Sequence, residues 1–356
     1  MYLDELTCRG FRCLAEVEFK PERGLNLIRG QNAQGKTSLL ESILFAATSK
    51  SHRTSVETDL AAHGGDGFRV ALHVVRSDRE VSLEVNWWQG AKRVKVNGVA
   101  QSRMSDTLGK VRVVLFSPED IALVKGSAAT RRKFLDMELS QLSPAYLTGL
   151  QSYRQVLRQR NELLRAPKPD EGQLDAWDQQ LIEHAKILIV ERAAFIQELG
   201  DFAAQAYTAI AHNEELALRY RPDLPEESLE QSLLESRASD IRRKQTSHGP
   251  HRDDIEFVIA GKPARSHASQ GQQKSAALAV KLAELELVKS RTGDYPILML
   301  DEVLAELDAE RAEHLFDAIG EEVQCILTTT ELGETSSIAR RSAASFVIKQ
   351  GNLSRA

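Results

Sequence analysis

The order of apolar and polar residues predicts β structure at the beginning of the chain. Segments of strand length cover Leu3–Arg9, Glu16–Phe19 and Leu25–Ile28, and the last leads directly into a glycine-rich stretch. Apolar residues at helical spacing follow over Ser38–Ala47. The pattern therefore predicts a strand, a glycine-rich loop and a helix in direct succession.

Four more strands are predicted before residue 120. Apolar and polar residues alternate over Phe68–Arg76, Glu80–Trp88 and Arg93–Val96, and an Asn97-Gly98 turn follows. This pattern is typical of an antiparallel meander. The continuous apolar run Val111–Phe116 is typical of a strand buried on both faces.

The middle of the chain has a helical pattern from about residue 128 to residue 212. Ser143-Pro144 predicts a helix restart, and an Ala-Pro-Lys-Pro sequence at 166–169 interrupts the pattern. The helix after it would carry an apolar stripe from Leu174 to Ile210 and would be about 55 Å long. These helices predict a projecting arm, and Pro225–Lys244 predicts a further helix of the same lobe.

Strands and helices alternate again after Gly249. The pattern predicts strands at Ile255–Ile259, Ile297–Leu300, Val323–Thr328 and Phe346–Lys349, and helices at Gly271–Ser290 and Asp308–Ile319. The predicted fold class is α/β, with an antiparallel β subdomain and an inserted all-helical arm. The predicted parts are 1–127, 128–245 and 246–356, of which the first and third form one head.

Composition narrows the classes of protein that fit. Of 356 residues 42% are hydrophobic and 27% charged, which is ordinary for a soluble globular protein. The formal charge of −5 means that a nucleic-acid partner needs a local basic surface. Three cysteines without a C-x-x-C pair predict no disulfide framework and a cytoplasmic location. No apolar run approaches the roughly 20 residues that span a bilayer, so no membrane partner is expected.

The glycine-rich stretch fits the P-loop pattern G-x-x-x-x-G-K-[ST]. Its candidate nucleotide-binding residues are Gly30, Gln31, Asn32, Ala33, Gln34, Gly35, Lys36 and Thr37. The backbone N–H groups of such a loop face phosphates at the positive end of a helix. Lys36 would reach the β- and γ-phosphates of ATP, and the Thr37 hydroxyl would bind Mg²⁺. The alternative is a chance glycine-rich turn, against which the flanking strand and helix argue.

Two further segments could complete a nucleotide site. The strand Ile297–Leu300 runs into Asp301, a candidate Mg²⁺ ligand, and Glu302, which would orient or deprotonate the attacking water. Ser269 is a candidate helix N-cap, and Gly271 permits close backbone approach, which together would make an anion site. Taken by itself, this segment favours an ordinary capped helix start over an anion site, and both interpretations stay open.

The order of these motifs resembles that of the ABC ATPases. Glu306-Leu307-Asp308 is similar to the D-loop of that superfamily. Within it, the chain resembles the RecF family of bacterial recombination mediators along essentially its whole length. The stretches that carry this resemblance are Asn32–Thr37 with Leu40-Glu41, Phe116–Asp120, Gly249–Asp254, Gly271–Lys274 and Thr328–Thr330.

The resemblance implies an SMC- and Rad50-like ABC-type P-loop ATPase head that binds ATP and Mg²⁺ and hydrolyses ATP weakly, with stimulation by DNA. It implies an ATP-dependent homodimer that binds single-stranded, double-stranded or gapped DNA. RecO and RecR would be its partners in loading a recombinase at single-strand gaps, in DNA repair, replication restart and the SOS response to DNA damage.

The resemblance also implies roles for individual residues. Ser269, Gly271 and Gln272 would contact the γ-phosphate held by the other copy, and Asp308 would lie near the dimer seam. Thr329 or Thr330 stands where many ABC ATPases keep a switch histidine. The missing histidine implies slow hydrolysis or γ-phosphate sensing by a hydroxyl.

Two alternatives remain. The first is an ABC ATPase subunit of another system, such as a transporter or a translation factor. The single P-loop and the absence of a full L-S-G-G-Q sequence and of the switch histidine argue against it. The second is an ATP-binding scaffold without significant catalysis, which the missing histidine keeps open.

Other residues have a structural and a functional interpretation. Basic residues on the arm are candidate DNA contacts or parts of solvated helix faces: Arg131, Arg132, Lys133, Arg154, Arg158, Arg160, Arg242, Arg243 and Lys244. Arg252 could form an ion pair with Asp253 or Asp254, and Arg53 could lie near the nucleotide. His52 and His251 could be ligands or core residues, and we expect a structural role because neither lies in metal-ligand spacing. Trp87 and Trp88 could stack on bases, and we expect them to pack instead.

Overall fold

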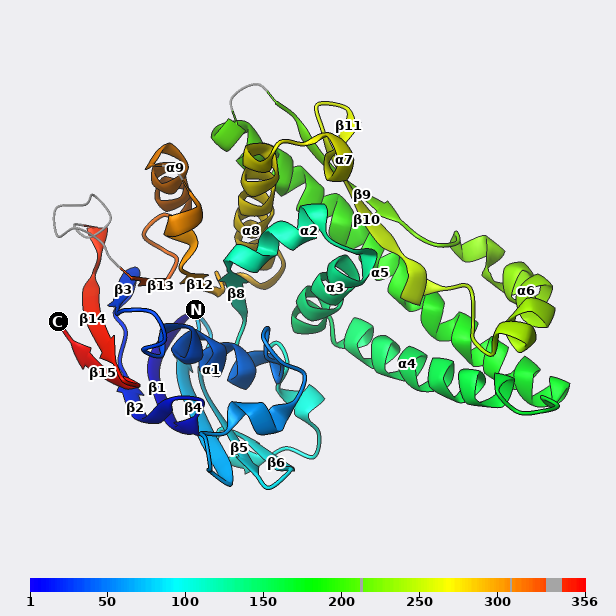
Figure 1. Cartoon of the computed structure of the whole chain (residues 1–356), viewed down its shortest axis with the longest axis horizontal. Coiled ribbons are helices and arrows are strands. Elements are labelled where there is room, and N and C mark those ends of the chain that lie inside the picture. Colours follow the sequence, from blue (N-terminus) through cyan, green and yellow to red (C-terminus); the bar gives the residue numbers. More distant parts are fainter. Residues whose placement is uncertain (212–213, 308, 331–340) are drawn as a thin grey trace. The chain divides into compact units, whose positions relative to one another are not determined.

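The computed structural model describes residues 1–211, 214–307, 309–330 and 341–356, which divide into two compact units (Figure 1). Unit 1 consists of Met1–Asp120, Ala209–His212 and Lys274–Ala356, and unit 2 consists of Ile121–Thr208 and Asn213–Gln273. The P-loop and Asp301 therefore belong to unit 1, whereas Ser269 and Gly271 belong to unit 2.

A six-stranded sheet in unit 1 carries the P-loop. Its strand order is β15-β14-β3-β13-β12-β8, and all neighbours are parallel except β14 and β15. The strands are β3 (Leu25–Arg29), β8 (Val113–Phe116), β12 (Ile297–Asp301), β13 (Cys325–Thr329), β14 (Ala344–Lys349) and β15 (Asn352–Arg355). Because parallel strands end at the same edge, the loops that follow β3, β12 and β13 meet there.

The second sheet of unit 1 is antiparallel, as predicted. Its order is β2-β1-β4-β5-β6-β7. The strands are β1 (Tyr2–Phe11), β2 (Leu14–Phe19), β4 (Gly67–Val75), β5 (Glu80–Trp88), β6 (Ala91–Val96) and β7 (Val99–Ala100). Alternate residues of β5, from Val81 to Trp87, are buried, so one face of this sheet packs on the core.

Helix α1 (Lys36–Thr48) packs against strands of both sheets, and all of its residues except Thr37 are buried. This burial explains why its sequence is apolar on several sides, since a helix enclosed by two sheets has no solvent face. Two more helices are α8 (Gln270–Thr292), which continues from unit 2 into unit 1, and α9 (Ala309–Ile319).

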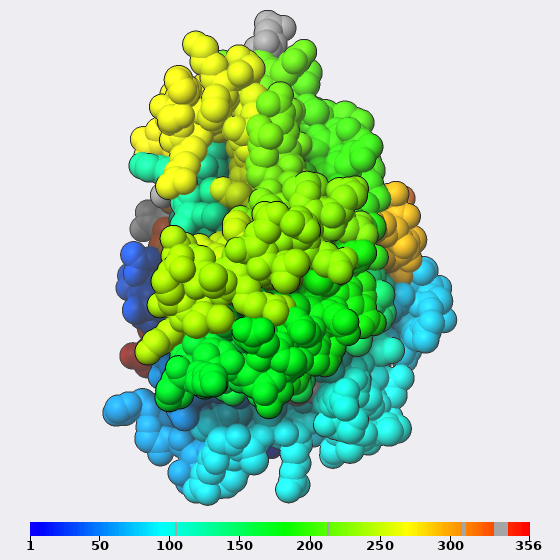
Figure 2. Space-filling model, turned by 90° about the vertical axis from the view of Figure 1, so that its right-hand side faces the viewer, coloured from blue at the N-terminus to red at the C-terminus, as the bar shows by residue number. Residues whose placement is uncertain are grey.

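Unit 2 contains the predicted helical arm. Its helices are α2 (Ile121–Lys125), α3 (Ala128–Leu142), α4 (Pro144–Leu164), α5 (Glu171–Ala211), α6 (Leu229–Arg243) and α7 (Ala264–His267). The Ser143-Pro144 restart is confirmed, because the Ser143 hydroxyl accepts the Tyr146 N–H at the start of α4. In Figure 2 the atoms of α4 and α6 form one continuous surface. Arg160 of α4 is buried and joins Asp178 of α5 and Asp240 of α6.

The prediction of an all-helical arm was wrong. Unit 2 also holds a three-stranded antiparallel sheet of β9 (Leu216–Arg221), β10 (Asp254–Ile259) and β11 (Lys262–Pro263). β9 forms because it pairs with β10, and unit 2 accordingly extends to Gln273, well past the predicted boundary at 245. Phe346–Lys349 was the last strand that the sequence predicted, and the structure has one more, β15, after it.

Candidate nucleotide-binding site

The P-loop connects β3 to α1, and its two glycines are required for different reasons. Gly35 has a φ of +114°, a conformation that side chains disfavour. Gly30 must leave room for β14, because a Cβ there would lie 2.5 Å from the carbonyl oxygen of Ile348. Between them, Gln31, Asn32 and Ala33 are exposed. The loop thus curls tightly and presents its middle to solvent.

Lys36 lies inside this curl. Its side chain is buried, and Nζ donates to the carbonyl oxygens of Gly30, at 2.7 Å, and of Gln31, at 2.9 Å. Nζ also lies 3.0 Å from Oε1 of Glu302, a carboxylate that is about one-third exposed. The ammonium therefore stands between the P-loop backbone and the end of β12.

Asp301 joins β12 to the P-loop helix. Its Oδ1 accepts hydrogen bonds from the hydroxyls of Thr37, at 3.2 Å, and Thr328, at 2.7 Å. Burial raises the pKa of the Asp301 carboxyl, and these two hydrogen bonds oppose that effect. Asp301 therefore belongs to a small buried polar network, in which an additional cation would be favoured.

The sequence drew attention to Thr329, but Thr328 makes the contact with Asp301. Thr328 also accepts the backbone N–H of Glu302, both at its hydroxyl oxygen, at 3.1 Å, and at its carbonyl oxygen, at 3.2 Å. Thr329 is buried one residue later, and its carbonyl oxygen accepts the Gly30 N–H at 3.3 Å. Thr328 and not Thr329 contacts Asp301 because the register of β12 and β13 pairs Asp301 with Thr328. The local sequence does not indicate this register.

A second group of side chains fixes the segment that follows α1. The fully buried Glu41 accepts two hydrogen bonds from Arg12, at 2.8 and 3.0 Å, and one from Ser51, at 2.5 Å. Burial alone would raise the pKa of Glu41, but these hydrogen bonds outweigh it and lower the pKa. Arg53 lies 3.5 Å from the same carboxylate. Burial lowers the pKa of His52, and the nearby carboxylate of Glu41 opposes this effect.

The signature segment begins α8 with a reciprocal capping box. The Ser269 hydroxyl accepts the Gln272 N–H at 3.2 Å, and the Ser269 N–H donates to Oε1 of Gln272 at 2.7 Å. The Gln272 side chain also donates to Glu214. Ser269 is exposed, and Gly271 is partly exposed. Asp308, the predicted D-loop residue, lies outside the described residues.

The polar groups at Asp301 fit Mg²⁺. Mg²⁺ prefers hard oxygen ligands and in nucleotide sites usually takes only one or two from the protein. Thr37 and Asp301 supply such oxygens side by side. No group of three or more His, Cys, Asp or Glu side chains that could hold a metal ion occurs in the part of the chain that the structure describes.

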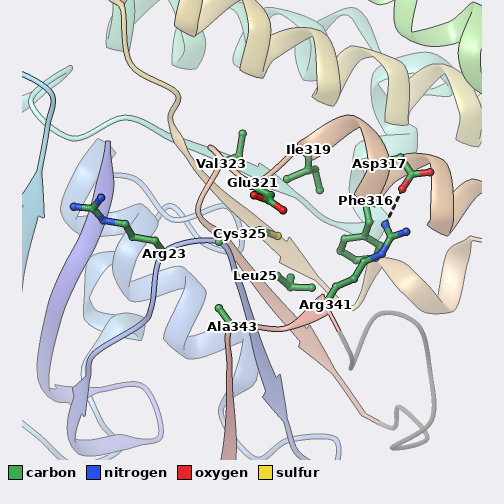
Figure 3. Close-up of a pocket in the computed structure, with 12 residues that line it drawn as sticks. Arg23, Leu25, Phe316, Asp317, Ile319, Glu321, Val323, Cys325, Arg341 and Ala343 are labelled. Carbon is green, nitrogen blue, oxygen red and sulfur yellow. Dashed lines mark hydrogen bonds and ion pairs between the residues drawn. The ribbon is translucent and has the colours of Figure 1, made fainter.

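A pocket in unit 1 lies at the opposite edge of the parallel sheet (Figure 3). Leu25 and Cys325, which line it, are the first residues of β3 and β13, and Ala343 directly precedes β14. The P-loop follows the last residue of β3. This pocket is therefore separate from the candidate nucleotide site.

Two of the arginines considered as DNA contacts are buried in ion pairs. Arg131 donates to both oxygens of Asp254, at 2.6 and 2.9 Å. Arg160 is fully buried between Asp178 and Asp240. Both the DNA-contact and the solvated-face interpretations are wrong for these two residues, because their guanidinium groups are buried and pair with carboxylates within unit 2.

Two other expectations need correction. Asp253 pairs with Arg192 and Asp254 with Arg131, so the ion pair that was one possibility for Arg252 is not formed, and Arg252 is exposed. Trp87 packs as expected, stacked on Phe68, but Trp88 is 59% exposed.

Comparison with known proteins identifies the family. A family model described as the RecF/RecN/SMC N terminal domain matches residues 2–351. The DNA replication and repair protein RecF of Symbiobacterium thermophilum is 41% identical over 93% of this chain and 92% of its own length. RecF of Halalkalibacterium halodurans is 40% identical over 100% of both chains. The chain belongs to the RecF family.

Solved RecF structures have the same fold. A structure described as RecF-ATP in the RecFOR pathway has a TM-score of 0.92 and 32% identity, and the match covers 100% of this chain and 97% of that one. An Smc head bound to the C-winged helix domain of ScpA, with a TM-score of 0.60 and 17% identity, shares the fold alone. The predicted α/β ABC-type ATPase head and the RecF resemblance are confirmed. No helix among the described residues is long and apolar enough to cross a membrane.

Proposed function

We propose that this chain binds ATP with Mg²⁺ at the P-loop and acts as an ATP-dependent DNA-binding protein of recombinational repair and replication restart. Membership of the RecF family supports the pathway, and the likeness to a RecF-ATP structure supports the nucleotide. In this proposal an ATP-bound homodimer binds DNA in the cytoplasm and works with RecO and RecR to load a recombinase at single-strand gaps.

The observation that carries the proposal is the contact between Thr37 and Asp301. It joins the P-loop helix to the end of β12 through two oxygen atoms 3.2 Å apart. A bound Mg²⁺ would neutralise charge on the phosphates and take its remaining ligands from them and from water. Thr37 and Asp301 would hold that ion, and Thr328 would keep the Asp301 carboxylate in place.

Lys36 and Glu302 have complementary tasks in this proposal. Lys36 would exchange its contacts with Glu302 and the loop carbonyls for phosphate oxygens. Its departure would leave the Glu302 carboxylate available to orient the attacking water and accept its proton. Glu302 would therefore become competent as a base only when phosphate is present.

We further propose that the site is completed by a second copy. Ser269 and Gly271, with Gln272, would meet the γ-phosphate held by that copy, Asp308 would lie near the seam, and Thr329 would take part in γ-phosphate sensing. Support comes from the exposure of Ser269, whose hydroxyl accepts one hydrogen bond within the cap and can still donate its proton. Hydrolysis is proposed to be slow and stimulated by DNA.

The proposal is tested with two lysines that are equally buried in unit 1. Lys36→Met removes the ammonium from the P-loop, whereas Lys281→Met removes one that pairs with Glu284 and Asp120. ATP affinity, measured by calorimetric titration, should fall about a hundredfold or more in Lys36→Met, because hydrogen bonds to charged phosphates are lost. Lys281→Met should keep its ATP affinity. Undiminished ATP binding by Lys36→Met would refute the nucleotide site.

A further inference from the structure

The hairpin at the end of the chain lies against the P-loop. β14 pairs with β3 up to Val347 and Arg29 and then continues beside the loop that follows β3. Its Ile348 approaches both P-loop glycines: a Cβ on Gly30 would meet the Ile348 carbonyl oxygen at 2.5 Å, and a Cβ on Gly35 would meet Ile348 Cδ1 at 3.1 Å.

The turn of this hairpin also forms hydrogen bonds with the P-loop. Gln350 and Gly351 connect β14 to β15 with φ angles of 50° and 75°. The Gln350 N–H donates to the Gln34 side-chain oxygen at 2.7 Å, and the Gly351 N–H donates to the Gln34 carbonyl oxygen at 2.9 Å. The hairpin thus approaches the P-loop at Gly30, Gln34 and Gly35.

We propose that the Gln350-Gly351 turn is a positioning element of the nucleotide site, which holds Gln34 so that the loop amides face the phosphates. This inference rests on the proposed function. The Gln350 amide binds the side chain of Gln34, and the Gly351 amide binds its backbone carbonyl. Both hydrogen bonds form together only when the turn and the Gln34 peptide keep this relative position. Since a P-loop binds phosphate through backbone N–H groups, the orientation of its peptides determines affinity.

Gly351 has no room for a side chain. A Cβ there would lie 2.0 Å from the carbonyl oxygen of Cys13, in the turn between β1 and β2. Any larger residue must move the hairpin away from Cys13, and Gln34 would move with it or lose both hydrogen bonds. Misplacement by about 1 Å can slow catalysis about a hundredfold. A loop whose amides no longer face the phosphates should likewise bind them more weakly.

The chain contains a matched control turn. Gln89-Gly90 joins β5 to β6 with φ angles of 45° and 86°, so it has the same two residues in the same left-handed conformation. Gly90 is exposed and a Cβ there would meet nothing within 4 Å, whereas Gly351 is buried. Gly90→Ala and Gly351→Ala therefore introduce similar backbone strain, but only Gly351→Ala disturbs the P-loop.

The test compares ATP affinity and urea unfolding of the full chain and these two variants. We expect ATP affinity to fall about tenfold or more in Gly351→Ala and to stay within about twofold in Gly90→Ala. Equal ATP affinities in the two variants would overturn the inference and leave the proposed function intact. Absence of ATP binding by the unmodified chain would instead refute the proposed function.

A second variant covers the case in which Gly351→Ala does not fold. Gln34→Ala removes the side-chain acceptor of the Gln350 amide and leaves both turns unaltered. Hydrogen exchange of the Gln350 amide should become faster, that of the Gln89 amide, which donates to Asp66, should not change, and ATP affinity should fall several-fold. Unchanged ATP affinity, or unchanged exchange at Gln350, would contradict a positioning role.

Discussion

At the scale of single residues, Glu302, the proposed base, forms an ion pair with Lys36, the proposed phosphate ligand. Glu302 and a bound phosphate would therefore compete for the Lys36 ammonium. Glu302 has a left-handed backbone, with a φ of 54°, and two contacts of its N–H with Thr328 hold it there. Such strain in a residue other than glycine persists where the surroundings fix it and is common at functional sites. The carboxylate is therefore held within reach of both Lys36 and an approaching phosphate.

The two carboxylates at the end of β12 should respond differently to neutralisation. Glu302→Gln keeps the side-chain shape and removes the negative charge that competes for Lys36, so ATP should bind at least as tightly while single-turnover hydrolysis falls about a hundredfold or more. Asp301→Asn should weaken ATP binding only when Mg²⁺ is present. Titrations with and without Mg²⁺ separate the two effects, and identical behaviour of the variants would show that the roles are misassigned.

Motif residues could be predicted from the sequence because their spacing is local. The P-loop pattern occupies eight consecutive residues, Gly30 to Thr37, and the capping box four, Ser269 to Gln272. Thr328 and the partners of Arg131 could not be predicted, since they depend on strand register and on packing between distant segments. The sequence likewise could not show that Gly30 makes room for Ile348.

At the scale of elements, the same distinction separates predicted from missed secondary structure. The long helix α5 repeats its apolar pattern over many turns, and this periodicity alone identifies it. β9 and β15 are short, with 6 and 4 residues, and exist because a neighbouring strand is available. Leu216, Leu218 and Tyr220 do alternate with other residues, but so short a run does not distinguish a strand from a loop.

The Gly-Pro-His-Arg-Asp-Asp stretch before β10 has a structural role in unit 2. The Asp253 carboxylate accepts hydrogen bonds from the Arg192 guanidinium, at 2.7 Å, and from the Asp223 N–H, at 2.9 Å. His251 accepts the Tyr153 hydroxyl at Nδ1, at 2.7 Å, and its Nε2 donates to the Thr246 carbonyl oxygen at 3.2 Å. This arrangement requires a neutral imidazole, and burial lowers the pKa of His251 to about 4.

Unit 2 should therefore lose stability in mild acid. The pKa of His251 is depressed from 6.5 to about 4 in the folded chain. His251 therefore contributes fully to the free energy of unfolding above pH 6.5, and this contribution is lost as the pH falls toward 4. The loss amounts to roughly 3 kcal/mol by pH 4. In urea unfolding, His251→Gln should show a smaller fall between pH 6.5 and 4 than the unmodified chain. His267→Gln, at an exposed position of the same unit, is the control; an unchanged pH profile in His251→Gln would contradict the assignment.

At the scale of the whole molecule, the P-loop and the signature belong to different units of one chain. The proposed dimer would combine the P-loop of one copy with the signature of the other, so each ATP would be held by both copies. Binding of ATP would then promote dimerisation, since a ligand that contacts both copies binds the dimer more tightly than the monomer. The formal charge of −5 makes self-association without ATP less favourable.

A mixing experiment tests whether the site is shared. Ser269→Asp preserves the helix cap, because aspartate caps as well as serine, but it brings a negative charge to the place proposed for the γ-phosphate. Ser269→Asp alone should bind ATP and fail to dimerise or hydrolyse it. Lys36→Met alone should bind ATP about a hundredfold or more weakly and therefore should not dimerise or hydrolyse it at ATP concentrations that saturate the unmodified chain. When the two are mixed, each mixed dimer contains one site with an intact P-loop and an intact signature. Since neither variant forms a homodimer, the dimers in the mixture are mixed ones with one intact site of two, and hydrolysis should recover to at most about half of the unmodified rate. Full activity of Ser269→Asp alone would leave Ser269 as a helix cap only, and no recovery on mixing would contradict a site built from two chains.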